Sequence, residues 1–76
     1  MERLKKIMNG VLGVKEEDVN DDMSTKNVED WDSLRHMCLI VAIEEAYKVK
    51  LTAEDIVHMV NVKEIKRVLR DRGVVI

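Results

Sequence analysis

The chain has 76 residues, 46% of them hydrophobic, with one cysteine, two histidines and a formal net charge of −2. This length allows a single domain, residues 1–76, and the few cysteines and histidines provide neither an intrachain disulfide nor a closed zinc site. The acidic balance argues against nucleic acid as a partner. The longest apolar run, residues 37–43, is too short to span a bilayer, and the charged start lacks a signal-peptide pattern, so we expect a cytoplasmic protein without membrane insertion.

The first predicted element is an amphipathic helix near residues 2–12. Its apolar residues follow the i, i+3, i+4, i+7, i+8 spacing of one helical stripe, and they are Leu4, Ile7, Met8, Val11 and Leu12. The segment from Val14 to Trp31 is polar and acidic without a sustained period, which predicts a long loop. Loops of this length inside a small domain are normally either functional or disordered.

The second predicted helix runs from Ser33 to about Tyr47. Asp32 is its candidate N-cap, because a carboxylate at that position accepts a hydrogen bond from an early backbone N–H. The helix contains more apolar residues than the about three or four per two turns that one buried face requires. Either this helix is central and buried on several sides, or part of its apolar surface faces a partner.

Two shorter helices are predicted in the last third of the chain. Thr52 and Asp55 have capping-box spacing before the first of them, and Asn61 and Glu64 repeat that spacing before the second. Gly73 is expected to end the last helix, whose apolar stripe consists of Val62, Ile65, Val68 and Leu69. The predicted fold is therefore all-α, a four-helix bundle with a long first loop and a short third helix.

The stretch WDSLRHMCLIVAIEEAYKVKLTAEDI, with the downstream NVKEIKRVL, resembles the acyl carrier protein and peptidyl carrier protein family over nearly the whole chain. In that family the serine of a DSL motif opens the second helix of a four-helix bundle. The chain departs from the family at Asp30, where glycine is frequent, and at Arg35 and His36, where acidic residues are frequent. Trp31 before the motif is more similar to standalone carriers of specialised pathways.

The resemblance implies that Ser33 is esterified by 4'-phosphopantetheine, whose terminal thiol holds an acyl or aminoacyl group as a thioester. A serine in a first helical turn lies near free backbone N–H groups and the positive dipole end, which favour the phosphodiester anion. By analogy with the family, Asp32 would cap the helix and help present the serine to a transferase. Leu34 and Val41 share a stripe with Ser33 and are candidate partner contacts, and Arg35 would set the local charge.

A protein of this family would be a carrier, not an enzyme, and we expect it to be monomeric. Its implied partners are a phosphopantetheinyl transferase, an acyl- or aminoacyl-activating ligase, and a downstream transferase or synthase of fatty acid, polyketide or nonribosomal peptide biosynthesis. Tethering raises the effective concentration of the cargo at each enzyme. The sequence leaves the identity of the cargo open.

A hydrolase is one competing interpretation. Asp32, Ser33 and His36 fall within one helical turn, and they are the three residue types of a serine hydrolase triad. A triad also requires an acid that orients the far nitrogen of the base, an oxyanion hole and a substrate pocket. One exposed turn offers none of these by itself, so the sequence favours the carrier.

A calcium-binding helical module is the second alternative. Residues 18–29 place Asp18, Asn20, Asp22 and Glu29 at positions 1, 3, 5 and 12 of an EF-hand-like loop. Met23 stands where such a loop requires glycine for its sharp turn. We therefore predict no dedicated metal site, although weak binding of a divalent cation by the acidic loop remains open. The carrier interpretation depends on Ser33, whereas the calcium interpretation depends on Glu29.

Overall fold

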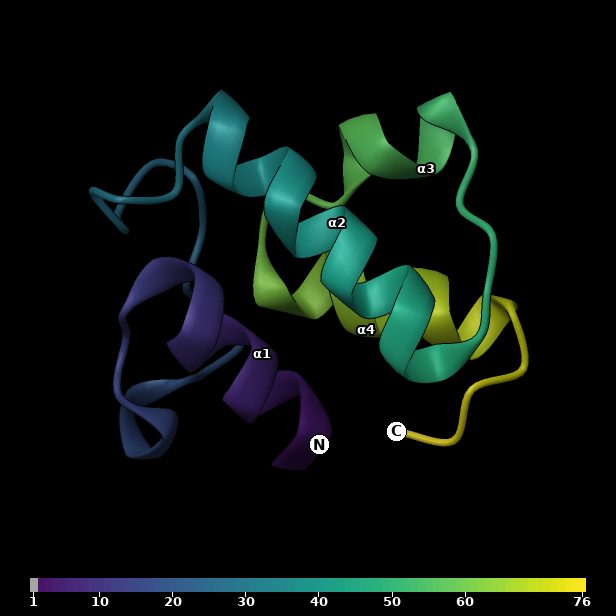
Figure 1. The fold of residues 1–76 in the computed structure, drawn as a ribbon, viewed down its shortest axis with the longest axis horizontal. Coiled ribbons are helices and arrows are strands. Elements are labelled where there is room, and N and C mark those ends of the chain that lie inside the picture. The colour runs from purple at the N-terminus through teal and green to yellow at the C-terminus, as the bar shows by residue number, and fades with distance from the viewer. Residues whose placement is uncertain (1) are drawn as a thin grey trace.

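The computed structural model describes residues 2–76, and within that range it has four α-helices, one short 3-10 helix and no strand (Figure 1). In chain order these elements are α1 (Glu2–Leu12), η1 (Glu16–Asp18), α2 (Ser33–Tyr47), α3 (Ala53–His58) and α4 (Val62–Asp71). In Figure 1, α2 crosses the middle of the molecule, with α4 behind it and α1 and α3 on either side. The predicted all-helical fold with a short third helix is confirmed.

The helices begin where short polar side chains cap them. Asp32 accepts a hydrogen bond from the backbone N–H of Arg35 at 2.8 Å. Thr52 and Asp55 form the complete reciprocal capping box at the start of α3. Asn61 caps α4 by accepting from the N–H of Glu64, whose carboxylate accepts from the Arg67 side chain at 2.7 Å. The second predicted capping box is therefore made only in its first half.

Left-handed backbone conformations follow α2 and α4. Lys48, with φ of 57°, is the C-cap of α2, and its N–H donates to the carbonyl oxygen of Glu44. Gly73, with φ of 86°, follows α4 and is the predicted stop. Glycine adopts such angles without a steric penalty, whereas lysine does so at some cost.

The long loop between α1 and α2 is fixed by backbone hydrogen bonds to the connection between α3 and α4. The N–H of Thr25 donates to the carbonyl oxygen of Val60, and the N–H of Val62 donates to that of Met23, each at 3.0 Å. Trp31, at the end of the loop, is only 2% exposed and belongs to the core. The aperiodic sequence of the loop does not predict these attachments, because their partners lie far along the chain.

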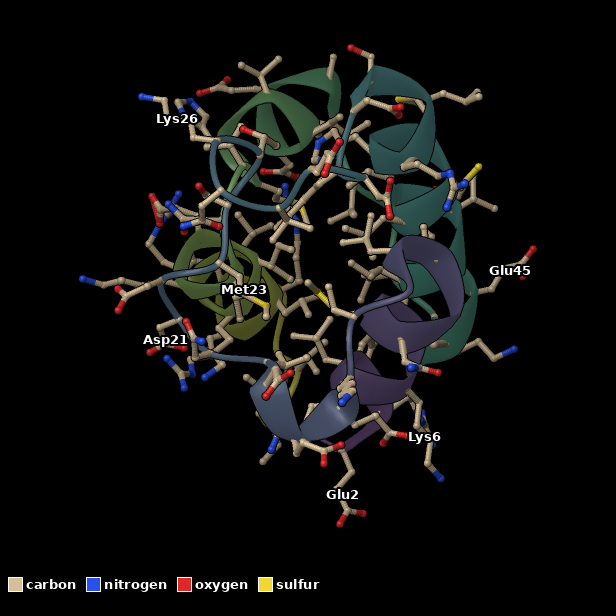
Figure 2. The ribbon with its side chains drawn as sticks, turned by 90° about the vertical axis from the view of Figure 1, so that its left-hand side faces the viewer. Glu2, Lys6, Asp21, Met23, Lys26 and Glu45 are labelled. Atoms are coloured by element: carbon tan, nitrogen blue, oxygen red, sulfur yellow. The ribbon has the colours of Figure 1, made fainter. Side chains whose placement is uncertain are left out.

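The core is built from buried apolar side chains of α1, α2 and α4 together with Val19, Trp31 and Met59, and the half-buried Ile56 of α3 packs against it. Helix α2 contributes Leu39, Ile40 and Ile43, which form one buried stripe, while its opposite side is exposed. Charged side chains such as Glu2, Lys6 and Glu45 project outward around this core (Figure 2). The excess of apolar residues in α2 therefore lies on the surface, so this helix is not buried on several sides. Within residues 2–76 no helix is long and apolar enough to cross a membrane.

Candidate functional site

Ser33 is the first residue of α2, and its side chain is exposed. Asp32 has an extended backbone, so the helix starts one residue later. Its carboxylate accepts from the N–H of Arg35, and its carbonyl oxygen accepts from the N–H of His36 at 2.8 Å. The N–H groups of Ser33 and Leu34 have no acceptor within the helix, as is general for a first turn. An anion attached to the Ser33 oxygen would meet these donors and the positive end of the helix dipole.

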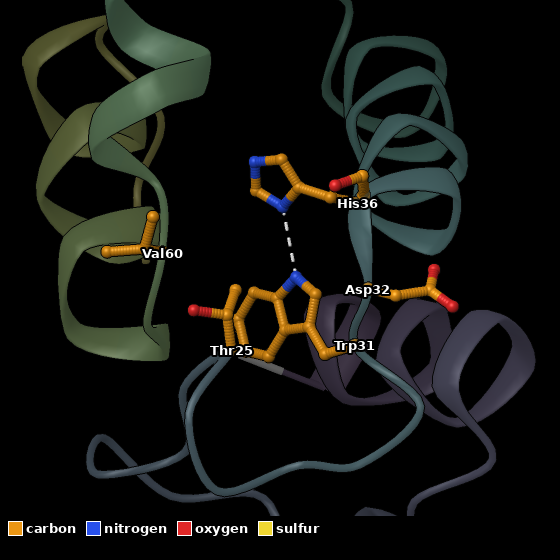
Figure 3. A pocket seen from close by; sticks show the side chains of 6 residues that line it. Thr25, Trp31, Asp32, His36 and Val60 are labelled. Carbon is orange, nitrogen blue, oxygen red and sulfur yellow. Dashed lines mark hydrogen bonds between the residues drawn. The ribbon is translucent and has the colours of Figure 1, made fainter.

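An open pocket of about 380 Å³ lies beside Ser33 (Figure 3). Three segments line it: the long loop, the first turn of α2, and the connection between α3 and α4, through Thr25, Trp31, Asp32, Ser33, His36 and Val60. The indole of Trp31 and the side chain of Val60 supply apolar surface next to the polar start of α2. The exposed hydroxyl of Ser33 therefore lies beside a partly apolar pocket that is open to solvent.

His36 is held by hydrogen bonds on both of its ring nitrogens. The indole Nε1 of Trp31 lies 3.0 Å from Nδ1 (Figure 3), and Nε2 lies 2.9 Å from the carbonyl oxygen of Ile56. Since Nδ1 must accept from the indole, Nε2 carries the hydrogen and donates to Ile56. Neither nitrogen is left to take a proton from Ser33, and Asp32 caps the helix, so the arrangement gives the hydrolase interpretation no support.

The side of α2 that faces away from the core presents several apolar side chains to solvent. Leu34 is 73% exposed, Val41 50% and Met37 49%. Arg35 is exposed, but its guanidinium donates to the carbonyl oxygen of Val11 at 2.7 Å. The structure thus places all three predicted partner contacts, Leu34, Arg35 and Val41, at the surface. Their role in partner binding stays a prediction.

The acidic loop does not have the arrangement of an EF-hand. Helix α1 ends at Leu12 and α2 begins at Ser33, so helices do not directly flank residues 18–29. Asn20 donates to the carbonyl oxygen of Asp18 and accepts from the N–H of Asp22, which is a local turn. Among residues 2–76, no group of three or more histidine, cysteine, aspartate or glutamate side chains is placed to hold a metal ion. The calcium alternative gains no support from this geometry.

Two ion pairs join the long loop and α3 to α4 and to the residue that follows it. Asp21 in the long loop pairs with Lys66 of α4 at 2.6 Å, and Asp55 of α3 pairs with Arg72 beyond α4. The hydrogen bond from Lys66 lowers the pKa of Asp21, and the hydrogen bond from Arg72, followed by that from the Thr52 backbone, lowers the pKa of Asp55. Both pairs join segments distant in sequence, so they could not be predicted from local patterns.

Sequence reasoning missed the wall of the pocket opposite α2. Thr25 and Val60 line it, and the carbonyl oxygen of Ile56 anchors His36. The sequence contains one signal for the wall formed by the start of α2, because Trp31 and His36 lie on the two sides of the capping residue Asp32. Their contact depends on the path of the loop, which the sequence pattern does not specify.

A small helical domain that displays an exposed serine at the start of its second helix has the architecture of a carrier of a covalently attached group. A family model described as the phosphopantetheine attachment site matches residues 2–69, and the chain belongs to that family. A sequence search found no match among curated proteins. The resemblance drawn from the DSL motif and the expected cofactor, covalent 4'-phosphopantetheine, are confirmed at the level of the family.

The residues around the first turn of α2 fit this group. The Ser33 hydroxyl is accessible, two backbone N–H groups are available to the phosphate, and the pocket beside them is open rather than closed. Asp32 is the nearest carboxylate along the chain, and its Oδ1 is directed to the N–H of Arg35 as the helix cap. The geometry can therefore accommodate a phosphodiester on the Ser33 oxygen and a flexible arm that leaves the surface there.

Proposed function

We propose that this protein is a carrier that holds an acyl or aminoacyl intermediate as a thioester on a 4'-phosphopantetheine arm attached to Ser33. The observation that supports this proposal best is the exposed position of Ser33 at the start of α2, inside the segment that the family model matches. Ser24 is the other serine of the chain, and its hydroxyl accepts a hydrogen bond from the N–H of Lys26 within a loop turn. Ser33 is therefore the better attachment point.

When bound, the arm supplies a terminal thiol that forms a thioester with the cargo. In the attachment step the Ser33 oxygen would bond to the phosphorus that carries the phosphopantetheine half of coenzyme A, and the P–O bond of the diphosphate bridge would break. The nucleotide half would leave as adenosine 3',5'-bisphosphate, and a base of the transferase would take the hydroxyl proton. Asp32 fixes the start of α2, and the N–H groups of Ser33 and Leu34 stabilise the phosphodiester anion. The protein itself needs no catalytic group, because its partners perform the chemistry.

The proposed partners are a phosphopantetheinyl transferase, an acyl- or aminoacyl-activating ligase, and a downstream transferase or synthase. The exposed side chains of Leu34 and Val41 would supply apolar contacts to these enzymes, with the positive charge of Arg35 beside them. A carrier must release each enzyme after transfer, which suits a small contact surface rather than an obligate interface. Tethering the cargo then replaces diffusion of a free intermediate.

Intact mass spectrometry tests the attachment site. The purified chain is incubated with coenzyme A and a phosphopantetheinyl transferase of broad specificity, and its mass should rise by one phosphopantetheine group. Ser33→Ala should abolish the addition while its circular dichroism stays helical. Ser24→Ala is the matched control, because it removes the other hydroxyl of the same kind, and it should be modified as the wild type is. An arm on the Ser33→Ala variant would refute the assignment.

A further inference from the structure

A chain of two hydrogen bonds joins three segments around the pocket beside Ser33. Trp31 at the end of the long loop donates to His36 on α2, and His36 is bonded in turn to the carbonyl oxygen of Ile56 on α3. Trp31 is 2% exposed, and His36 is half-buried. Backbone hydrogen bonds join the long loop to the connection after α3, and the His36 side chain adds a link from Trp31 to α3 itself.

The two hydrogen bonds require one protonation state of His36. An indole N–H is a donor only, so the nitrogen that faces it must offer a lone pair. The other nitrogen faces a carbonyl oxygen, which only accepts, so it must carry the hydrogen. Only the neutral ring with hydrogen on Nε2 satisfies both partners. A second proton on Nδ1 would point at the indole N–H and break that bond.

We propose that His36 is a positioning residue: in its neutral form it bonds to both Trp31, which lines the pocket beside Ser33, and α3, and its protonation releases Trp31. Release of Trp31 is expected to affect Ser33, because Trp31 is adjacent to Asp32, and Asp32 caps the helix that begins at Ser33. The effect on arm attachment depends on the proposed function of Ser33. The link between His36 and Trp31 does not.

The other ionisable side chains near this link belong to the same three segments. Asp32 is the other ionisable residue that lines the pocket, and its carboxylate is occupied as the helix cap. Ionisable groups close to this link along the chain are Lys26, Glu29 and Asp30 on the loop, Arg35 and Cys38 on α2, and Glu54, Asp55 and His58 on α3. Of all these side chains, histidines alone change charge between about pH 5 and 8 at ordinary pKa values. His58 is therefore the matched control for His36.

Fluorescence of Trp31 gives a direct measurement, because it is the single tryptophan of the chain. We expect the emission of the wild-type protein to change in one step as the pH falls, because a second proton on His36 would break its bond to the indole. His36→Asn should remove this step, since an asparagine amide oxygen can accept from the indole but does not titrate. His58→Gln should retain it. A step that persists in His36→Asn, or one that disappears in His58→Gln, would overturn the proposal.

The rate of arm attachment gives the second measurement. The rate for the wild type divided by the rate for His36→Asn cancels the pH dependence of the transferase itself. As the pH falls through the fluorescence step, this ratio should drop by about two- to tenfold, the factor that one hydrogen bond of ordinary net strength provides. A ratio that does not change with pH would show that His36 does not position the site.

Two further variants keep the proposal testable if His36→Asn does not fold. His36→Gln, like His36→Asn, introduces an amide that does not titrate, and it should likewise lack the fluorescence step. Trp31→Phe removes the indole donor, so its attachment rate relative to His36→Gln should not change with pH. If the wild type acquires no arm at all, the proposed function of Ser33 fails, while the fluorescence experiment still decides the role of His36.

Discussion

The guanidinium of Arg35 donates a hydrogen bond to the carbonyl oxygen of Val11 and thereby joins the first turn of α2 to the last turn of α1. The last carbonyl groups of a helix have no donor within that helix, so Arg35 satisfies an acceptor that otherwise faces water. This contact holds the start of α2 against the end of α1 beside the candidate site. Arg35, which is exposed and was predicted to contact partners and set the local charge, therefore also connects two helices.

Arg35→Ala should lower the free energy of unfolding by about 0.5 to 1.5 kcal/mol, the net value of an ordinary hydrogen bond. Lys6→Ala, which removes the same charge from an exposed position of α1, should change it by less than about 0.5 kcal/mol. Urea denaturation followed by circular dichroism measures both values. Equal effects of the two variants would mean that the contact with Val11 contributes nothing.

Glu44 fixes the connection between α2 and α3, because its Oε2 accepts from the N–H of Leu51 at 2.8 Å in a half-buried position. Glu44→Ala should cost about 1.5 to 3 kcal/mol of stability, since it removes a charged acceptor from that N–H. The neighbouring Glu45 is exposed, so Glu45→Ala should change stability by less than about 0.5 kcal/mol. Thermal unfolding of the two variants compares them directly, and similar midpoints would contradict the role of Glu44.

The parts of the fold that were predictable from sequence are those that depend on neighbours in the chain. Asp32 and Thr52 cap their helices through hydrogen bonds to residues three positions later, so a spacing rule suffices to find them. Asn61 shows the limit of that rule. Its N–H partner is as predicted, but the Glu64 carboxylate binds Arg67, because a cation one turn later competes with the backbone N–H.

The parts that were not predictable depend on residues that the fold brings together. The exposed serine followed from a motif, but the pocket beside it did not, because Thr25 and Val60 meet only after the loop has paired with the connection before α4. The same holds for the bond between His36 and Ile56, which are 20 residues apart. The motif therefore identified Ser33 as the candidate attachment point, whereas the surroundings of Ser33 depend on the fold.

The ion pair between Asp55 and Arg72 predicts a dependence of stability on pH. The hydrogen bond from Arg72 is the first cause, and the backbone N–H of Thr52 the second, of the lowered pKa of the Asp55 carboxyl. A carboxyl whose pKa is lower in the folded state adds stability above its ordinary pKa of about 4, and this stability is lost as the pH falls through the lowered value. Asp21, whose pKa Lys66 lowers, acts in the same direction.

Asp55→Asn should therefore reduce the difference in stability between neutral and acidic solution. Chemical denaturation at several values between about pH 6 and about pH 2 measures this difference for each protein. Asp30→Asn is the control, because Asp30 is exposed in the loop, and it should leave the acid dependence as in the wild type. If the stability of Asp55→Asn depended on pH as that of the wild type does, other carboxyl groups would account for acid unfolding.

Leu34 and Leu39 provide a matched pair on α2 that separates docking from folding. Leu34 is 73% exposed beside Ser33, whereas Leu39 is completely buried. Leu34→Ala should change stability by less than about 0.5 kcal/mol, and Leu39→Ala should cost about 2 to 5 kcal/mol. If Leu34 anchors partner enzymes, its alanine variant should be loaded more slowly by the transferase or the activating ligase at an unchanged melting midpoint. Wild-type loading rates for Leu34→Ala would place the docking surface elsewhere, and Val41→Ala would then be the next variant to measure.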